Sequence, residues 1–221
     1  MPYVRYFSSM ETRAIEEAIV VALRQIATDA TIDLKSAGEI QITERLVLEL
    51  NRLVNLDPPE VMGFSAALLE TITRGGELRS FDGTSLEKRP DLVFRRQGVL
   101  PGFLRDFCGL FVECKVVDSA HPVHLYGGQG IARFVHGEYA WAMSTGMLVG
   151  YARNEHALPK SLADHLQSHG DKYHTKAGSL TLEYAIPEGA VCVTLHGKPW
   201  TYGNGQAPGE IRLSHMWFTI A

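Results

Sequence analysis

Two acidic residues and a lysine lie in neighbouring segments that have the composition of β-strands. Asp91 follows Pro90 and precedes the apolar run at residues 92–94, and Glu113 and Lys115 lie inside the longer apolar run at residues 110–117. Runs rich in β-branched and aromatic residues favour strands. Side chains two positions apart on a strand point to the same face. Glu113 and Lys115 should therefore share one face of a buried sheet.

A carboxylate and an ammonium group in a buried strand need compensation, because their burial is otherwise costly. A divalent cation supplies it, since Mg²⁺ is commonly held by one or two carboxylates, with water and substrate phosphate completing the shell. Lys115 beside such an ion would orient an attacking water and stabilise charge on a phosphate. The alternative is a surface ion pair between Glu113 and Lys115 on an edge strand, but the apolar residues on both sides of them favour burial.

At these residues the chain resembles the PD-(D/E)xK phosphodiesterase superfamily, the restriction-endonuclease-like nucleases. Pro90 and Asp91 match the first half of the motif, and Glu113, Cys114 and Lys115 match the second half. The resemblance implies an α/β fold with a restriction-endonuclease-like core, in which helices flank a central mixed β-sheet. It also implies that Asp91 and Glu113 bind Mg²⁺ or Mn²⁺, joined by the Cys114 carbonyl, and that Lys115 assists the water. E-x-K alone is a common pattern, so the specificity comes from its position in the strand after a Pro-Asp pair.

A third acid is expected on the helix predicted at residues 40–54. Glu39 projects onto the apolar face of this helix at its first turn, whereas Glu44 points roughly the opposite way. The family often carries an acidic ligand on the helix before the sheet, so Glu39 is the predicted third ligand, with Glu44 in reserve. A glutamate at this position could instead interact only with the helix dipole. The apolar face consists of Ile42, Leu46, Leu50 and Leu53.

A further helix, predicted at residues 129–145, would face the same site. Gln129 and Arg133 share one of its faces with His136, Ala140 and Met143. Several nuclease families of this fold place a Gln there, so the resemblance gives Gln129 a catalytic role, although Arg133 stands where those families have Tyr. Arg133 and Lys115 are the predicted contacts to substrate phosphate.

A zinc site is a poor alternative for the histidines of this region. Only two residues, Pro122 and Val123, lie between His121 and His124, and the segment offers no cysteine partner. A role toward solvent or phosphate is therefore favoured for His121, His124 and His136.

The remaining pattern predicts a single α/β domain over residues 1–221. Further helices are expected at residues 10–30, 60–74 and 159–168, and further strands at 146–151, 180–186, 190–195 and 211–220. Residues 98–107 should join the two motif strands as a hairpin with a long loop. The order strand, helix, strand after the motif predicts a parallel pair with a right-handed crossover.

Composition narrows the class of protein. A 45% hydrophobic and 21% charged chain has the make-up of a globular domain. No apolar run reaches bilayer length and no signal-peptide pattern is visible, so no membrane association is predicted. An odd number of cysteines, three, fits a reducing cytoplasm. A net charge of −4 excludes a basic surface overall but allows a local basic channel, for which the candidates are Arg79, Lys88, Arg89, Arg95, Arg96 and Arg105.

The sequence thus predicts a metal-dependent endonuclease that hydrolyses phosphodiester bonds in DNA. A nuclease of this size would act as a homodimer or with a partner subunit for targeting. Its resemblance to restriction or phage-defence effectors is by analogy alone. The alternative is a catalytically silent nuclease-fold module that binds nucleic acid or a partner subunit. A third possibility is a metal-dependent hydrolase of small phosphate substrates.

Overall fold

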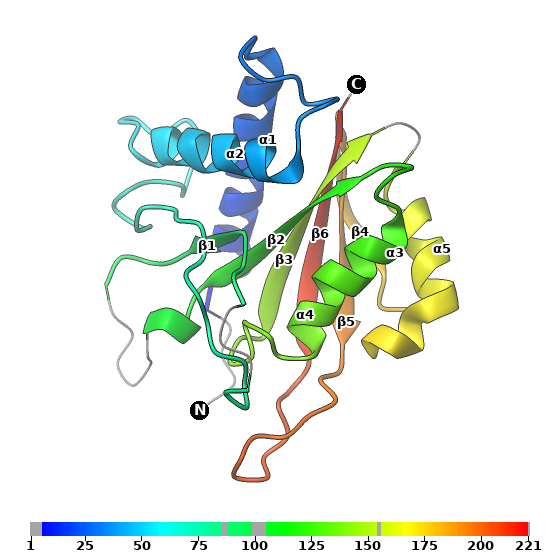
Figure 1. Ribbon diagram of the computed structural model, residues 1–221. Helices are drawn as coiled ribbons and strands as arrows, with labels where there is room; N and C mark the ends of the chain where they lie inside the picture. The colour runs from blue at the N-terminus through cyan, green and yellow to red at the C-terminus, as the bar shows by residue number, and fades with distance from the viewer. Residues whose placement is uncertain (1–5, 85–87, 99–104, 154–155, 221) are drawn as a thin grey trace.

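A six-stranded mixed β-sheet forms the centre of the molecule, with helices on both faces (Figure 1). The computed structural model describes residues 6–84, 88–98, 105–153 and 156–220. The strand order is β1-β2-β3-β6-β5-β4, in which β2, β3 and β6 are mutually parallel and the other neighbours are antiparallel. The strands are β1 Leu92–Phe94, β2 Leu110–Val117, β3 Thr145–Arg153, β4 Thr181–Ile186, β5 Gly189–His196 and β6 Ile211–Ile220.

These strands confirm the predicted α/β class and the predicted strand positions. β1 and β2 pair antiparallel with Val93 opposite Phe111, as expected for a hairpin, although residues 99–104 of its loop lie outside the described ranges. β2 and β3 pair in parallel, as the strand–helix–strand order predicts. Because β2 has neighbours on both sides and is buried throughout, the alternative of an edge strand is wrong.

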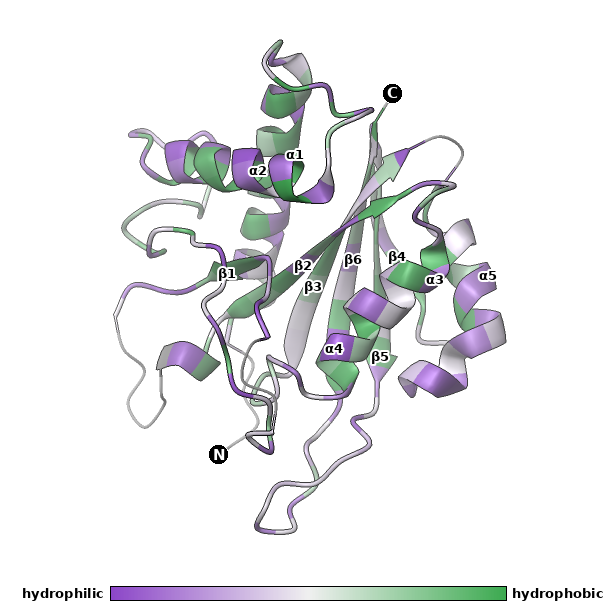
Figure 2. Cartoon of the chain, in the orientation of Figure 1, coloured by the Kyte–Doolittle hydropathy of each residue, from purple (hydrophilic) through white to green (hydrophobic). Residues whose placement is uncertain are grey.

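Three helices also match their predicted positions: α1 Ser9–Thr28, α2 Glu39–Val54 and α5 Lys160–His169. Ser8 caps α1 and forms a capping box with Glu11, which satisfies two backbone donors at the start of the helix. The predicted apolar face of α2 is buried. Figure 2 shows hydrophilic and hydrophobic residues alternating along α2, and a hydrophilic band in the middle of the otherwise hydrophobic β2. None of the described helices is long and apolar enough to cross a membrane.

Neighbouring residues of β6 show that the helices cover opposite faces of the sheet. Ser214 donates to Glu16 of α1 at 2.6 Å, whereas His215 contacts the hydroxyl group of Tyr126 at 2.9 Å. Tyr126 ends the short helix α3 (Val123–Tyr126). Because successive side chains of a strand point to opposite faces, α1 and α3 lie on different sides of the sheet. The chain also contains two short 3₁₀ turns: η1 Arg105–Phe107 precedes β2, and η3 Gly170–Tyr173 follows α5.

The helix predicted at residues 60–74 is absent, so this prediction was wrong. The second half of the segment is extended and pairs antiparallel with β1 at Thr73 to Val93, and with the residues after β1 at Leu69 to Arg96, through isolated bridges. Asn51 of α2 holds this segment by both polar groups of its side-chain amide, which bond the backbone N–H and carbonyl of Ile72. The segment satisfies backbone groups that β1 would otherwise leave open. The segment therefore buries its apolar residues in an extended conformation rather than as a helix.

The helix predicted at residues 129–145 is displaced toward the N-terminus. Helical structure begins with α3, continues through a π-helical turn, η2 Gly127–Ile131, and ends with α4 Ala132–Val135. Gly137, with φ of 70°, then turns the chain out of the helix. The predicted face is therefore broken, because Ala140 and Met143 lie beyond the helix. Gly130 within this helical segment permits close packing, because a Cβ at this position would lie 2.6 Å from Leu148.

Candidate active site

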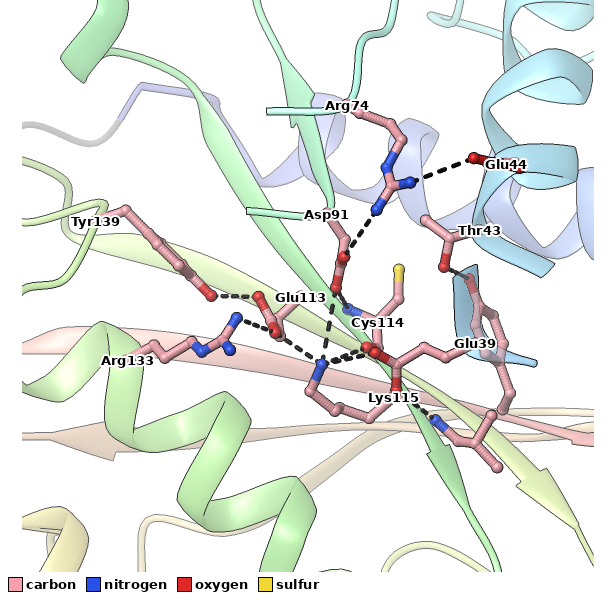
Figure 3. A network of polar contacts seen from close by, with 12 residues as sticks. Glu39, Thr43, Glu44, Arg74, Asp91, Glu113, Cys114, Lys115, Arg133 and Tyr139 are labelled. Atoms are coloured by element: carbon pink, nitrogen blue, oxygen red, sulfur yellow. Dashed lines mark hydrogen bonds and ion pairs between the residues drawn. The ribbon is translucent and has the colours of Figure 1, made fainter. Parts of the chain in front are cut away.

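Four residues that the sequence singled out meet on one side of β2 (Figure 3). The ammonium group of Lys115 lies 2.8 Å from Glu113 Oε1, 2.9 Å from Glu39 Oε1 and 3.9 Å from Asp91 Oδ2. It also donates to the backbone carbonyl of Cys114 at 2.9 Å. We call Glu39, Asp91 and Glu113 the acid cluster. Strands β1 and β2 and the start of α2 bring it together around one cation.

Two of the acids are fixed by the backbone of β2 as well as by Lys115. Asp91 Oδ2 accepts the N–H of Cys114 at 2.8 Å, and Glu39 Oε2 accepts the N–H of Val116 at 3.2 Å. Glu39 is the first residue of α2, so it lies at the positive end of the helix dipole and bonds the strand at the same time. The helix-dipole alternative and the site assignment are therefore compatible for Glu39.

The third acid, Glu113, is fully buried, and the partners that hold it among the described residues are side chains. Arg133 of α4 donates to its Oε1 at 2.6 Å, the same oxygen that Lys115 contacts. The buried hydroxyl of Tyr139 donates to its Oε2. Arg133 also lies 3.7 Å from Glu138, which pairs with Lys88. Glu113 thus faces two cations and one hydroxyl donor.

Arg74 contacts the acid cluster from the opposite side to Arg133 (Figure 3). Its guanidinium lies 3.7 Å from Asp91 Oδ1 and 3.5 Å from Glu44 Oε1. Glu44 is exposed and reaches the cluster only through this arginine, so the geometry favours Glu39 over Glu44 as the helix acid. Three cations, Lys115, Arg74 and Arg133, therefore contact the three carboxylates of the acid cluster, and one of these carboxylates, Glu113, is withdrawn from water altogether.

Burial and shared charges shift the pKa values of the site. Burial raises the pKa of Glu113 to about 7, because Lys115 and Arg133 only partly offset the desolvation and the charge of Asp91. Burial also raises the pKa of Asp91, against the pull of Lys115. Burial alone would lower the pKa of Lys115, but Glu113, Glu39 and Asp91 outweigh it and raise it to about 12. One ammonium is shared by three carboxylates, so it stays charged while Glu113 titrates near neutral pH.

The donor chemistry fits a hard divalent cation. The groups around Lys115 are carboxylate oxygens of Glu39, Asp91 and Glu113 together with the Cys114 carbonyl, and oxygen ligands of this kind suit Mg²⁺ or Mn²⁺. Among the described residues, no group of three or more His, Cys, Asp or Glu side chains is gathered closely enough to hold a metal ion as the side chains stand. Lys115 lies at the point toward which the oxygens converge.

Gln129 and part of the predicted basic channel have surroundings other than the acid cluster. Gln129 is exposed on the π-helical turn, and within the described ranges no hydrogen bond joins it to the acid cluster, so its catalytic role stays a prediction. Of the predicted basic channel, Lys88, Arg89 and Arg96 are paired with Glu138, Glu77 and Glu11. The side chain of Arg105 lies outside the described residues. His121 contacts Asp118 at 3.0 Å rather than a second histidine.

Two residues of the site were missed from the sequence: Tyr139 and Arg74. Tyr139 was included in the predicted long helix, and Arg74 was placed at the end of a helix that does not form. A glycine at residue 137, soon after the last apolar residues of the helix, was the available signal that the chain turns there. No comparable local signal marks Arg74.

No protein-family model, curated protein or solved structure matches this chain. The geometry and chemistry of the acid cluster therefore carry the functional conclusion.

Proposed function

We propose that this protein is a metal-dependent phosphodiesterase with a restriction-endonuclease-like core that hydrolyses DNA. The observation that carries the proposal is the convergence of Glu39, Asp91 and Glu113 on Lys115, on adjacent strands and one helix end. Burying these charges in the middle of a sheet is costly. Such an arrangement of acids with one lysine suits phosphoryl chemistry better than it suits structural stability.

The roles of the residues follow from their positions. Asp91, Glu113 and the Cys114 carbonyl, with Glu39, would hold Mg²⁺ or Mn²⁺, and the bound ion supplies Lewis-acid polarisation of a phosphate oxygen and a more acidic water. Lys115, charged and buried beside the acids, would orient the attacking water by hydrogen bonding. Arg133 is partly exposed on α4 and would stabilise negative charge on the phosphate as the P–O bond to the leaving oxygen breaks. Tyr139 would hold Glu113 in place.

Cleavage of supercoiled plasmid tests the proposal. The wild-type protein would be incubated with plasmid in Mg²⁺, in Mn²⁺ and in EDTA, beside the variants Asp91→Ala and Lys115→Ala. We expect cleavage only with the metal, and a loss of about 100-fold or more in both variants. Lys160→Ala and Asp164→Ala are matched controls, because that ion pair is exposed on α5 far along the chain from the site. Equal cleavage by the wild type and both site variants would refute the proposal.

One observation favours a second candidate, a catalytically silent module that binds nucleic acid. Each carboxylate of the acid cluster already has a cationic partner, since Arg74 faces Asp91, Lys115 contacts Glu39, and Glu113 faces Arg133. A closed set of charges of this kind can be purely structural. DNA binding that weakens with salt, ignores Mg²⁺ and survives Glu113→Gln, together with no cleavage, would favour this candidate.

A further inference from the structure

Five half-buried aromatic side chains form an unbroken series of ring contacts near the candidate active site. Phe81 stacks on Trp200 with ring centroids 4.1 Å apart, and Trp200 meets Tyr202 at 5.2 Å. Tyr202 meets Trp141 at 6.2 Å, and Trp141 meets Phe107 at 4.8 Å. We call these five residues the aromatic cluster. They come from segments far apart in the sequence, so the fold assembles them.

Hydrogen bonds fix the orientation of the largest rings. The indole N–H of Trp200 donates to the Val135 carbonyl at 3.0 Å, and that of Trp141 donates to the Arg79 carbonyl at 3.1 Å. The hydroxyl of Tyr202 donates to the Trp141 carbonyl at 3.1 Å. The two indole N–H groups and the Tyr202 hydroxyl are thus bonded within the protein, and each of the five side chains keeps part of its surface exposed. Because the rings are already ordered, a flat partner would bind them at little entropic cost.

A lysine side chain, whose pKa is lowered to about 7 by burial, lies beside the aromatic cluster. The ammonium group of Lys198 is 5.6 Å from the centre of the Trp200 ring. It donates at 3.0 Å to each of the carbonyls of Trp141 and Met143, which places it between the cluster and the start of β3. Aromatic side chains with exposed surface bind single-stranded nucleic acid because unpaired bases stack on the rings, and this stacking, rather than the charge of Lys198, carries the attraction here.

One short segment connects the aromatic cluster with the acid cluster. Gly137 packs so closely that an added Cβ would lie 2.8 Å from Phe81 and 3.0 Å from Trp200. Two residues later, Tyr139 donates to the carboxylate of Glu113. Two residues later again, Trp141 belongs to the aromatic cluster itself. Bases resting on the cluster would therefore belong to nucleotides close to the proposed cleavage site.

We propose that the aromatic cluster is a stacking surface for unpaired bases of a single DNA strand whose backbone passes the acid cluster. The inference rests on the proposed function and adds a substrate class to it. Bases of a duplex are paired and stacked on one another, so they cannot lie on these rings, whereas unpaired bases can. The substrate is therefore single-stranded DNA, or duplex DNA with a locally unpaired stretch.

Binding of a labelled oligothymidylate in EDTA tests this inference without cleavage. The double variant Trp141→Leu/Trp200→Leu removes two aromatic faces, and its matched control Trp141→Phe/Trp200→Phe keeps them. Both variants lose the same two indole hydrogen bonds, so their folding costs should be alike. We expect the leucine variant to bind about tenfold or more weakly than the wild type, and the phenylalanine variant to stay within about threefold. Equal affinities for all three proteins, or no binding of the oligonucleotide by the wild type, would overturn the inference.

Tryptophan fluorescence gives a readout on the wild-type protein, in case the leucine variant does not fold. The chain has three tryptophans, and Trp217 is buried, so a change on binding reports Trp141 and Trp200. Oligothymidylate should quench this fluorescence, whereas inorganic phosphate should not, and an unchanged spectrum would contradict stacking. Because these measurements contain no metal, they are independent of plasmid cleavage. Aromatic-dependent binding without any cleavage would count against the proposed function alone, and Lys115-dependent cleavage without aromatic-dependent binding would count against this inference alone.

Discussion

Glu113→Gln should stabilise the protein above neutral pH while it abolishes cleavage. Glu113 is fully buried, and its pKa is raised to about 7 because desolvation outweighs its cationic partners. Glutamine has nearly the same shape and no charge. Its amide oxygen can accept from Lys115 and Arg133 in place of Oε1, and its amide NH₂ can donate to the hydroxyl oxygen of Tyr139. The variant therefore resembles the protonated wild-type side chain.

The magnitude follows from the difference in proton affinity between the folded and unfolded chains. The ordinary pKa of 4.5 applies when the chain is unfolded, against about 7 in the fold. Below pH 4.5 the carboxyl is protonated in both states, and its contribution to stability is complete. Between pH 4.5 and about 7 the folded protein keeps the proton that the unfolded chain has released, so the free energy of unfolding falls as the pH rises. Once the pH has passed the folded pKa, about 3 kcal/mol of that free energy is lost. At about pH 8 the glutamine variant should therefore be more stable by roughly 3 kcal/mol, or roughly 5–10 °C in Tm.

Urea and thermal unfolding of both proteins in EDTA, at about pH 4 and about pH 8, measure this difference. Near pH 4 the two proteins should have similar free energies of unfolding, and near pH 8 they should diverge. Glu44→Gln is the control, because that carboxylate is exposed and its replacement should change little at either pH. A glutamine variant that is less stable than the wild type near pH 8, or a difference that does not change with pH, would refute the assignment of Glu113 as a desolvated and under-compensated acid.

Two further predictions concern residues that hold the site in place. Tyr139→Phe removes the donor to Glu113 Oε2 and should lower metal-dependent cleavage by about 10–100-fold. Tyr173→Phe removes a buried hydroxyl that contacts His165 and should leave cleavage unchanged. Plasmid-cleavage rates compare the two variants, and equal rates would contradict the positioning role. Gly130→Ala should cost about 1–3 kcal/mol in the free energy of unfolding, because its Cβ would meet Leu148 at 2.6 Å, while Gly128→Ala, which meets nothing within 4 Å, should be neutral or slightly stabilising. Urea unfolding of the two alanine variants tests the second prediction, and similar stabilities would show that the packing at Gly130 is looser than the structure implies.

Much of the fold was predictable because its signals are local. The strands are runs of apolar and β-branched residues, and the apolar spacing of α1 and α2 is regular over several turns. The site was predictable for a related reason: a Glu and a Lys inside a buried strand contradict the apolar pattern around them. Glu39 stood out in the same way, as an acid in line with an apolar helix face. Where a sequence breaks its own pattern, functional residues are the expected cause.

The absent helix and the displaced helix had causes that a local pattern does not contain. Residues 60–74 have apolar residues at helical spacing, but β1 offers open backbone groups and Asn51 fixes Ile72 by both polar atoms of its amide, so the pairing decides the conformation. The glycines at 127 and 130 resemble turn residues, yet they lie inside a helical segment. Contacts with Tyr173 and Leu148, which are distant in sequence, require them. Tertiary contacts overrode the local preference in both cases.

Tyr139 shows why the site itself could be predicted only in part. The main chain leaves the helix at Gly137 and adopts a φ of 53° at Ala140, a value that side-chain-bearing residues rarely take. These two turns direct the Tyr139 hydroxyl back to Glu113, which lies 26 positions earlier in the chain. Residue type and spacing reveal acids and bases that lie on the same strand face. Whether a hydroxyl group from a distant loop reaches one of them depends on the path of that loop, which the local sequence does not show.

The balance of charges in the acid cluster links stability to the proposed chemistry. Apolar residues of similar volume in place of Glu113 and Lys115 would be expected to stabilise a strand that is buried along its whole length. The protein instead keeps a carboxylate whose pKa is near neutrality beside an ammonium that stays charged. A cation bound to these oxygens would stabilise the charged form of Glu113, because Lys115 and Arg133 offset the cost of its desolvation only in part. The same features that destabilise the strand would thus favour ion binding. A substitution at Glu113 that stabilises the core would therefore also remove the proposed phosphodiesterase activity.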